Sequence, residues 1–193
     1  MKVLLTGFGP YGKERTNPTS EIVDTLNGKK IGGHVIVGHK FKVSANEVSK
    51  RLPRLIDHIQ PCLVLSLGLA PGRMQITPER VALNVADFSI PDDSRYEPVD
   101  KLIEPAGPAA YFATIPVKKI VRALLGAGIP SSLSNTAGTY LCNYIMYTSL
   151  NHIAKSRTGA KGGFIHVPYT TTLAAKISEK SKQQVASIDI HTM

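Results

Sequence analysis

Short apolar runs that end in Gly or Pro alternate along this chain with segments of helical spacing, and this alternation constrains the fold more than any other feature. The expected buried strands cover residues 2–6, 34–43, 62–72 and 162–169. The expected helices cover residues 20–28, 45–60, 116–128 and 139–156. Strands that alternate with helices predict an α/β fold, in which helices cover both faces of a largely parallel sheet.

The segments between these elements are less regular. The stretch from about 87 to 112 is rich in Pro, Asp and Gly, and a long irregular excursion of this kind is often functional in a compact domain. Residues 131–134 predict a short strand, and the tail from Thr170 predicts helix in part. The sequence shows no repeat and no linker, so we expect residues 1–193 to form a single domain.

Composition and charge narrow the class of protein. Hydrophobic residues make up 42% of the chain and charged residues 19%, which is ordinary for a globular protein. No apolar run approaches the roughly 20 residues that span a bilayer. The first strand ends too early to serve as a signal peptide, so we expect a cytoplasmic protein with reduced thiols. The net charge of +9 is dispersed along the sequence, which favours a solvated surface over a nucleic-acid site.

Parallel sheets bind ligands at the carboxyl ends of their strands, so the loops that follow the strands are the places to look for chemistry. Those loops read GFGPYG, GLAPGRMQITP, NTAGTYLC and VPYTT. The first is a poor nucleotide loop because Pro10 removes an N–H donor that a bound phosphate would need. No cluster of His, Asp and Glu has the spacing of a metal site, so we expect no metal.

Cys142, one of the two cysteines, lies where the small residues of NTAGT give way to a helical apolar pattern. If Thr139 is the N-cap, the thiol falls in the first turn, where the positive end of the helix favours a thiolate. Cys142 is then a candidate nucleophile, and small-residue packing is the alternative. Cys62 starts a buried strand and is expected to be core packing.

A cysteine nucleophile needs a base, and His166 is the histidine at the carboxyl end of a strand. A satisfied core histidine is the alternative reading. Glu79 is a candidate to orient the imidazole, because it precedes Val81, Leu83 and Val85 at even spacing and is expected to share their apolar face. A salt bridge between Glu79 and a nearby Arg is the alternative.

Six stretches that span nearly the whole chain carry a family resemblance: GFGPYGKERTNPT, LGLAPGRMQITPERVALN, IPDD, GPAAYFATIPVKKI, NTAGTYLCNYIMY and GFIHVPY. With these stretches the chain resembles the pyroglutamyl peptidase I, or pyrrolidone-carboxylate peptidase, family of cysteine peptidases. The resemblance implies a three-layer α/β/α sandwich around a largely parallel, mixed twisted sheet. It also implies no cofactor and frequent assembly as a homotetramer.

The resemblance further implies the removal of N-terminal 5-oxoproline from peptides and proteins through a thioester acyl-enzyme. It assigns Cys142 as nucleophile, His166 as base and Glu79 as the orienting carboxylate. An apolar pocket with a few hydrogen bonds suits the small, neutral lactam of such a substrate. The residues that the resemblance places in this pocket are Phe8, Tyr11, Asn17, Leu69, Ile90, Tyr140 and Leu141. For Phe8, a place in the core is the alternative.

Three departures from the family pattern stand out. Tyr11 replaces the usual Phe, and Ser89 replaces the usual Arg before Ile-Pro-Asp. The chain ends at Met193, where the family usually continues into a final long helix, so that residues 187–193 resemble only the start of that helix and suggest a truncation or a different end.

The Ser89 departure and the short tail keep open a catalytically weakened, lactam-binding relative of the same fold. A phosphate-dependent enzyme resembling nucleoside phosphorylases and a basic nucleic-acid binder are further alternatives.

Overall fold

The computed structural model describes residues 1–12 and 16–193, so that Lys13, Glu14 and Arg15 of the GFGPYGKERTNPT stretch lie outside the described residues. Within the described part, the central sheet has six strands in the order β2-β3-β1-β4-β8-β5. The strands are β1 (Lys2–Phe8), β2 (Lys30–Ile31), β3 (His34–Phe41), β4 (Leu63–Leu69), β5 (Thr77–Pro78) and β8 (Lys161–Val167). Strands β3, β1, β4 and β8 run parallel, and β2 and β5 add antiparallel edges. The predicted largely parallel, mixed sheet is confirmed.

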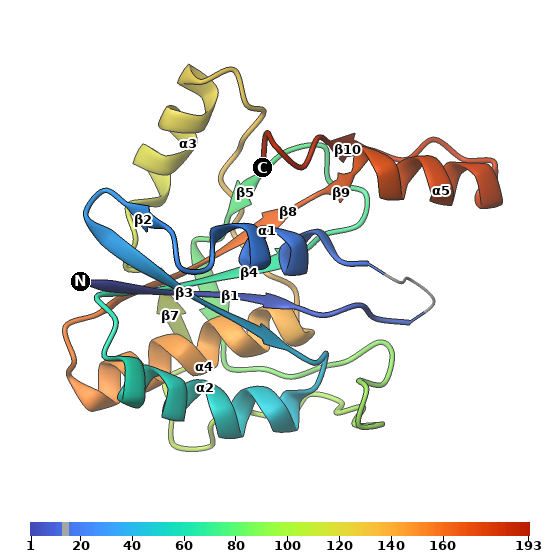
Figure 1. Cartoon of the computed structure of the whole chain (residues 1–193). Coiled ribbons are helices and arrows are strands. Elements are labelled where there is room, and N and C mark those ends of the chain that lie inside the picture. Colours follow the sequence, from blue (N-terminus) through green and yellow to red (C-terminus); the bar gives the residue numbers. More distant parts are fainter. Residues whose placement is uncertain (13–15) are drawn as a thin grey trace.

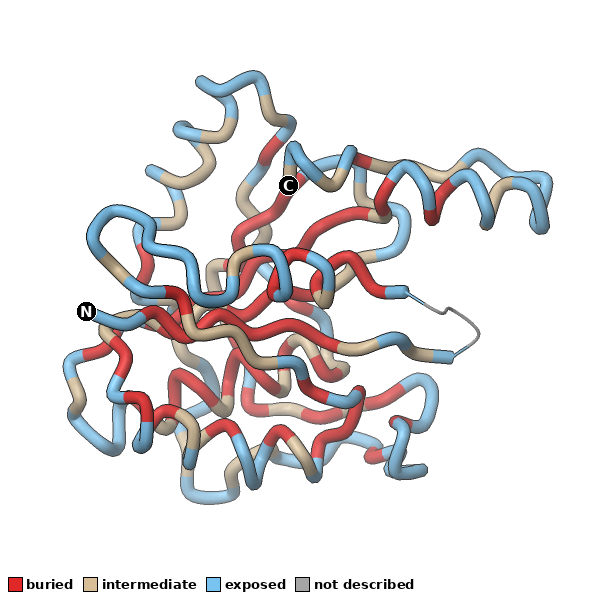
Figure 2. The backbone as a smooth tube through the Cα atoms, viewed as in Figure 1, coloured by how far each residue is buried: buried red, intermediate tan, exposed pale blue. Residues whose placement is uncertain are grey.

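The inner strands β1, β4 and β8 are buried on both faces because their alternate residues enter different hydrophobic clusters. In β1, Leu4 and Phe8 join one cluster, whereas Val3 and Leu5 join another on the opposite side. Figure 2 shows the strands as the buried centre of the molecule. This two-sided burial explains why the strands read as continuous apolar runs in the sequence.

Helices cover both faces of the sheet, as predicted (Figure 1). Helices α2 (Ala45–Ile59) and α4 (Leu141–Ser156) pack side by side on one face. Helix α1 (Pro18–Leu26) packs against β1, β3 and β4 on the other face, and α3 (Val117–Gly126) lies against β5. Helix α5 (Thr171–Ser181) projects from the end of β9 (Tyr169–Thr170).

The minor elements differ more from the prediction. Strand β6 covers only Val81–Leu83, pairs with β7 (Ala110–Phe112), and lies outside the central sheet. Residues 131–134 contribute single bridges rather than a strand. Residues 187–193 do not begin a helix: Ser187–Ile188 form β10, which pairs with β9 (Tyr169–Thr170). Backbone pairing to a neighbouring strand has displaced helix formation there.

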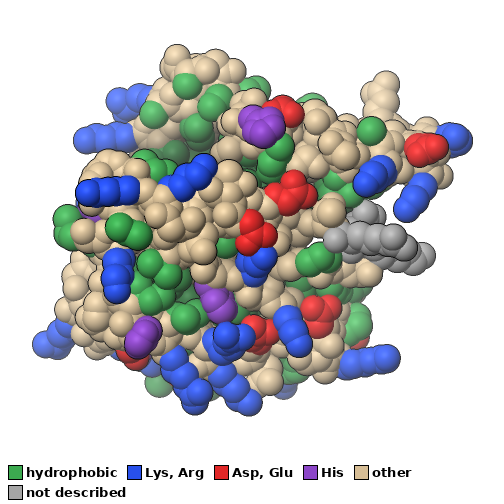
Figure 3. All heavy atoms as spheres, viewed as in Figure 1, with side chains coloured by type: hydrophobic (Ala, Val, Ile, Leu, Met, Phe, Trp, Pro, Cys, Tyr) green, Lys and Arg blue, Asp and Glu red, His purple; other side chains and the backbone are tan. Residues whose placement is uncertain are grey.

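Charge is spread over several elements of the face drawn in Figure 3, where Asp and Glu lie among the Lys and Arg side chains. Among the described residues, no helix is both long enough and apolar enough to cross a membrane.

The core contact between α2 and the sheet predicts a clear effect on stability. Leu52 of α2 is fully buried, so Leu52→Ala should lower the free energy of unfolding by about 2–5 kcal/mol. Leu102 is 58% exposed, and Leu102→Ala should change the free energy of unfolding by no more than about 0.5 kcal/mol. Urea denaturation of both variants gives the comparison, and equal losses would contradict the described packing.

Candidate active site

Parallel pairing of β4 with β8 sets the position of the site. The register places Gly68 of β4 directly beside His166 of β8, near the carboxyl ends of both strands. Cys142 comes to the same place from the first turn of α4, which packs against these two strands. The predicted meeting of Cys142 and His166 at the carboxyl edge of the sheet is therefore what the structure contains.

Gly68 makes room for the sulfur. A Cβ atom at position 68 would lie 2.7 Å from Cys142 Sγ and 2.5 Å from Phe164 Cζ, and real Cβ atoms do not approach other heavy atoms so closely. Only the absence of a side chain lets Cys142 Sγ rest against the β4 backbone. This close approach keeps the Cys142 thiol at the level of His166, which is paired with Gly68 on the neighbouring strand.

Glu79 reaches His166 through the sheet. Strand β5 pairs antiparallel with β8, so that Thr77 lies opposite His166. Two residues further along the chain, the Glu79 N–H donates to the Phe164 carbonyl at 2.9 Å. Glu79 and His166 consequently face the same side, and His166 Nδ1 lies 2.7 Å from Glu79 Oε1.

The prediction that Glu79 shares an apolar face with Val81, Leu83 and Val85 was wrong. Val81 and Val85 are only half-buried and Leu83 is exposed, whereas Ala82, Asn84 and Ala86 are buried. Pairing of β6 with β7 outside the central sheet reverses the buried side after Glu79. Glu79 is fully buried for a different reason, namely its place next to β8.

Arg73 binds the same carboxylate. Its Nη1 lies 2.7 Å from Glu79 Oε1 and also donates to Thr77 Oγ1. The salt bridge considered as an alternative role for Glu79 thus coexists with the contact to His166. Two donors on one buried oxygen offset the desolvation of the carboxylate, which would otherwise be costly.

The protonation of this group follows from its contacts. Burial alone would raise the pKa of the Glu79 carboxyl, but hydrogen bonds from His166, Ser134 and Arg73 hold that pKa below its ordinary value. Burial alone would lower the pKa of His166, but the charge and hydrogen bonding of Cys142 and then of Glu79 raise it to about 9. His166 is therefore an imidazolium at neutral pH, between two acidic partners.

The N-cap of helix α4 is one residue later than predicted. The N-cap is Tyr140 and not Thr139, whose hydroxyl donates instead to the Asp87 carbonyl at 2.7 Å. Cys142 still lies in the first turn, where backbone N–H groups lack an acceptor within the helix. The positive end of α4 therefore remains next to the sulfur.

A cavity of about 240 Å³ opens beside Cys142, and its lining is mainly apolar. The lining residues are Phe8, Tyr11, Asn17, Val43, Leu69, Pro71, Ile90, Tyr140, Leu141 and Cys142. All seven residues that the resemblance placed in a pocket thus line one cavity. Val43 and Pro71 were missed, because neither carries a side chain that a sequence pattern would mark as functional.

Two lining residues also have structural roles. Phe8 is 4% exposed and belongs to the core, so the two readings of Phe8 are both correct in part. The Asn17 amide donates to the Gly9 carbonyl at 3.0 Å and accepts from the Thr19 N–H at 3.0 Å as the N-cap of α1. Asn17 thereby fixes the GFGPY loop against the cavity.

The surroundings of the other cysteine, Cys62, differ from those of Cys142. Cys62 is half-buried and its thiol lies 3.3 Å from the Lys2 carbonyl, which fits packing at the start of β4. In the described part of the chain, no group of three or more His, Cys, Asp or Glu residues could hold a metal ion.

Comparison with known proteins shows the family of this chain. The family model described as pyroglutamyl peptidase matches residues 1–193. This chain belongs to the pyroglutamyl peptidase family. The family's known activity is the removal of N-terminal pyroglutamate, and the resemblance found in the sequence is confirmed.

Individual relatives of the pyroglutamyl peptidase family show how much of the chain is shared. Pyrrolidone-carboxylate peptidases of Yersinia pestis (strain Pestoides F) and Yersinia pseudotuberculosis serotype O:1b (strain IP 31758) are 48% identical over 168 residues, or 87% of this chain and 78% of theirs. The solved pyrrolidone carboxyl peptidase of Pyrococcus furiosus superposes with a TM-score of 0.96 at 42% identity, covering 100% of this chain and 92% of that one. The enzyme from Thermococcus litoralis gives 0.93 at 39% identity, covering 99% and 87%.

The space at Gly68 yields a direct prediction. Gly68→Ala should push Cys142 Sγ and the Phe164 ring aside, lowering the free energy of unfolding by about 1–3 kcal/mol. Iodoacetamide at neutral pH should label Cys142 before Cys62 in the intact chain, and the variant should slow Cys142 labelling. Mass spectrometry of the labelled peptides measures both rates.

Gly126→Ala is the matched control, since a Cβ there meets nothing within 4 Å. It should leave Cys142 labelling unchanged. Unaltered labelling in Gly68→Ala would contradict the described approach of the sulfur to β4.

Proposed function

We propose that this chain is a cysteine peptidase that removes an N-terminal pyroglutamyl residue from peptides through a thioester, with Cys142 as nucleophile, His166 as acid and base, and Glu79 as the orienting carboxylate. Membership in the pyroglutamyl peptidase family supports the activity. The observation that carries the residue roles is the interaction of His166 with Cys142 on one side and with Glu79, at 2.7 Å, on the other.

The first half of the reaction uses the thiolate and the imidazolium. Cys142 Sγ attacks the carbonyl carbon that joins the pyroglutamyl group to the next residue, and the carbonyl oxygen becomes an oxyanion. N–H groups in the first turn of α4, that of Cys142 among them, are suited to stabilise this oxyanion. His166 then gives its proton to the leaving amine, the C–N bond breaks, and a pyroglutamyl thioester remains.

The second half restores the enzyme. Neutral His166 takes a proton from water, the resulting hydroxide attacks the thioester carbon, and the C–S bond breaks. Free pyroglutamate and the Cys142 thiolate–His166 imidazolium pair result. Glu79, held by Arg73, keeps Nδ1 of the imidazole oriented in both halves.

The cavity beside Cys142 suits the lactam. A pyroglutamyl ring is small and uncharged, so apolar walls with a few polar groups can bind it without desolvating a charge. Phe8, Leu69 and Leu141 supply apolar wall, and Cys142 is also a lining residue. A cavity of about 240 Å³ beside the nucleophile also limits the acyl group to a small one.

Assembly and location complete the proposal. We propose a homotetramer in the cytoplasm, on the strength of the family resemblance. The described residues of α3 include none that is buried, and Leu125 of α3 is 53% exposed, which supports a partner surface on this helix. A cytoplasmic location keeps the Cys142 thiol reduced, as the reaction requires.

Removal of the sulfur tests the proposed function. The intact chain should hydrolyse the pyroglutamyl amide of 7-amino-4-methylcoumarin, and Cys142→Ala should lower kcat at least about a thousandfold, because the covalent route disappears. Cys62→Ala is the control and should retain activity. Released fluorophore gives the rate.

The same assay tests the alternative that this chain is a catalytically weakened relative. The exposed Ser89 beside Ile90 is the residue that favours this alternative. Absence of turnover by the intact chain, with the lactam still bound, would favour that alternative over the peptidase.

The protonation of His166 predicts a pH dependence. The imidazolium is lost as pH rises through its pKa, so kcat/KM should fall above about pH 9. Glu79→Gln removes a charge that raises this pKa, and the alkaline limb should therefore move to lower pH. Glu104→Gln, which alters contacts with Lys155 and Asn151, is the control and should keep the limb in place. An unmoved limb in Glu79→Gln would contradict the proposed role of Glu79.

A further inference from the structure

The hydroxyls of Tyr11 and Tyr140 converge on one carbonyl oxygen at the mouth of the lactam cavity. Tyr11 donates to the Pro91 carbonyl at 2.6 Å, and Tyr140 approaches the same oxygen at 3.4 Å. Tyr11 follows β1, Tyr140 begins α4, and Pro91 belongs to the irregular segment between β6 and β7. Three segments far apart in the sequence are therefore joined at a single acceptor.

All three segments contribute to the wall of the cavity. Tyr11 and Tyr140 line it, and so does Ile90, directly before Pro91. Ile90 is 48% exposed, so packing against the core does not by itself fix its position. The hydrogen bonds to Pro91 supply the restraint on this wall that burial does not.

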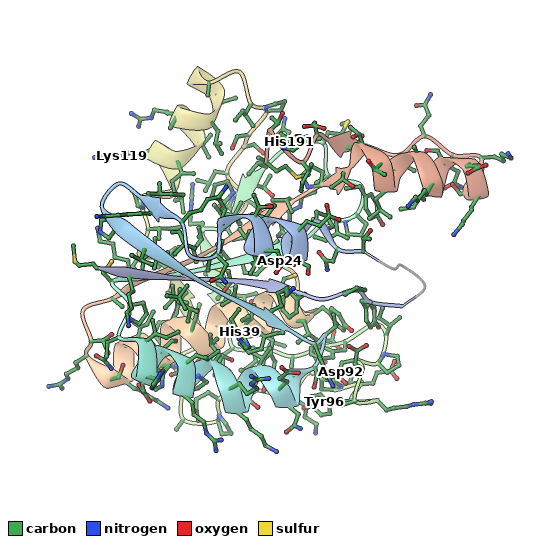
Figure 4. All side chains as sticks on the ribbon, in the orientation of Figure 1. Asp24, His39, Asp92, Tyr96, Lys119 and His191 are labelled. Atoms are coloured by element: carbon green, nitrogen blue, oxygen red, sulfur yellow. The ribbon has the colours of Figure 1, made fainter. Side chains whose placement is uncertain are left out.

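The residue directly after Pro91, Asp92, is anchored independently. The Asp92 carboxylate accepts from the backbone N–H groups of Ala45 at 2.8 Å, Ser94 at 2.7 Å and Tyr96 at 3.0 Å. Figure 4 shows Asp92 and Tyr96 close together near the start of α2. Asp92 therefore gives the segment a firm anchor next to Pro91, and the hydrogen bonds to the Pro91 carbonyl add a second restraint on the part that lines the cavity.

The side chains of Tyr11 and Tyr140 are suited to holding the Pro91 carbonyl. The Tyr140 ring packs edge-on against Phe88, with 4.6 Å between ring centroids. Burial and then the interaction with Tyr11 raise the pKa of Tyr140 above its ordinary value, so its hydroxyl stays protonated and can donate. A Phe at either position would keep the ring in the wall but would lose the donor.

We propose that Tyr11 and Tyr140 are specificity-determining residues, whose hydroxyls hold the Ile90–Pro91 wall so that the cavity accepts a five-membered lactam and rejects a larger ring. This inference rests on the proposed function, since it concerns the acyl site of that reaction. A wall that is free to move would admit an extra methylene at little loss, whereas a restrained wall would not.

A binding experiment tests the inference without any turnover. The intact chain should bind 2-pyrrolidone more tightly than 2-piperidone in an NMR titration. Tyr11→Phe should narrow that preference about fivefold, which is the order that one neutral hydrogen bond contributes. The double variant Tyr11→Phe/Tyr140→Phe should narrow it further.

Tyr111→Phe is the matched control. The Tyr111 hydroxyl also makes a hydrogen bond, to Asn151 Oδ1 at 3.2 Å, but Tyr111 is not a lining residue of the cavity. It should keep the preference for the smaller ring. A preference that stays the same in the double variant, or an intact chain that binds neither lactam, would overturn the inference.

Kinetics separate this inference from the proposed function. With coumarin amides of the five- and six-membered ring acids, Tyr11→Phe should raise KM for the smaller ring and leave kcat within about twofold. A fall in kcat alone, equal for both substrates, would place the hydroxyl in the chemistry and overturn the inference. Preferential lactam binding without hydrolysis by the intact chain would instead reject the proposed function and leave the inference standing.

Discussion

The close approach of a helix to a strand at one glycine is the constraint on which the site depends. Helix α4 can bring Cys142 Sγ against β4 only because position 68 has no Cβ. The parallel register of β4 and β8 then puts His166 at the same height as that glycine. The position of the sulfur relative to the imidazole is thus set by backbone geometry and does not rely on a flexible loop.

A second requirement is electrostatic. Glu79 is fully buried, and a buried carboxylate is stable only when its charge is matched by good donors. Arg73 and His166 both reach Oε1 at 2.7 Å, so that one oxygen is shared between a permanent cation and a titrating one. Because the Arg73 guanidinium still bonds Oε1, the Glu79 charge persists when His166 gives up its proton. The imidazole can therefore change state during a reaction while its support remains ionised.

The sequence predicted the main strands, the main helices and the meeting of Cys142 with His166, because apolar periodicity and the rule for parallel strand ends are local or topological signals. Glu79 was selected for an incorrect reason: the side on which Val81 and Leu83 lie depends on the partner strand β7, which periodicity does not reveal. No local sequence pattern indicated that Arg73 contacts Glu79. Gly68 did have a local signal, since a lone Gly in a buried strand indicates the close approach of another group.

The cavity wall is assembled from residues far apart in the sequence, since Phe8 and Tyr11 come from the first dozen residues and Tyr140 and Leu141 from the last third. An occupant would touch both, and would bind the folded chain while the unfolded chain offers it no comparable surface. Occupancy by substrate or product therefore adds to thermal resistance by mass action, and a chain depleted of its ligand would unfold at a lower temperature.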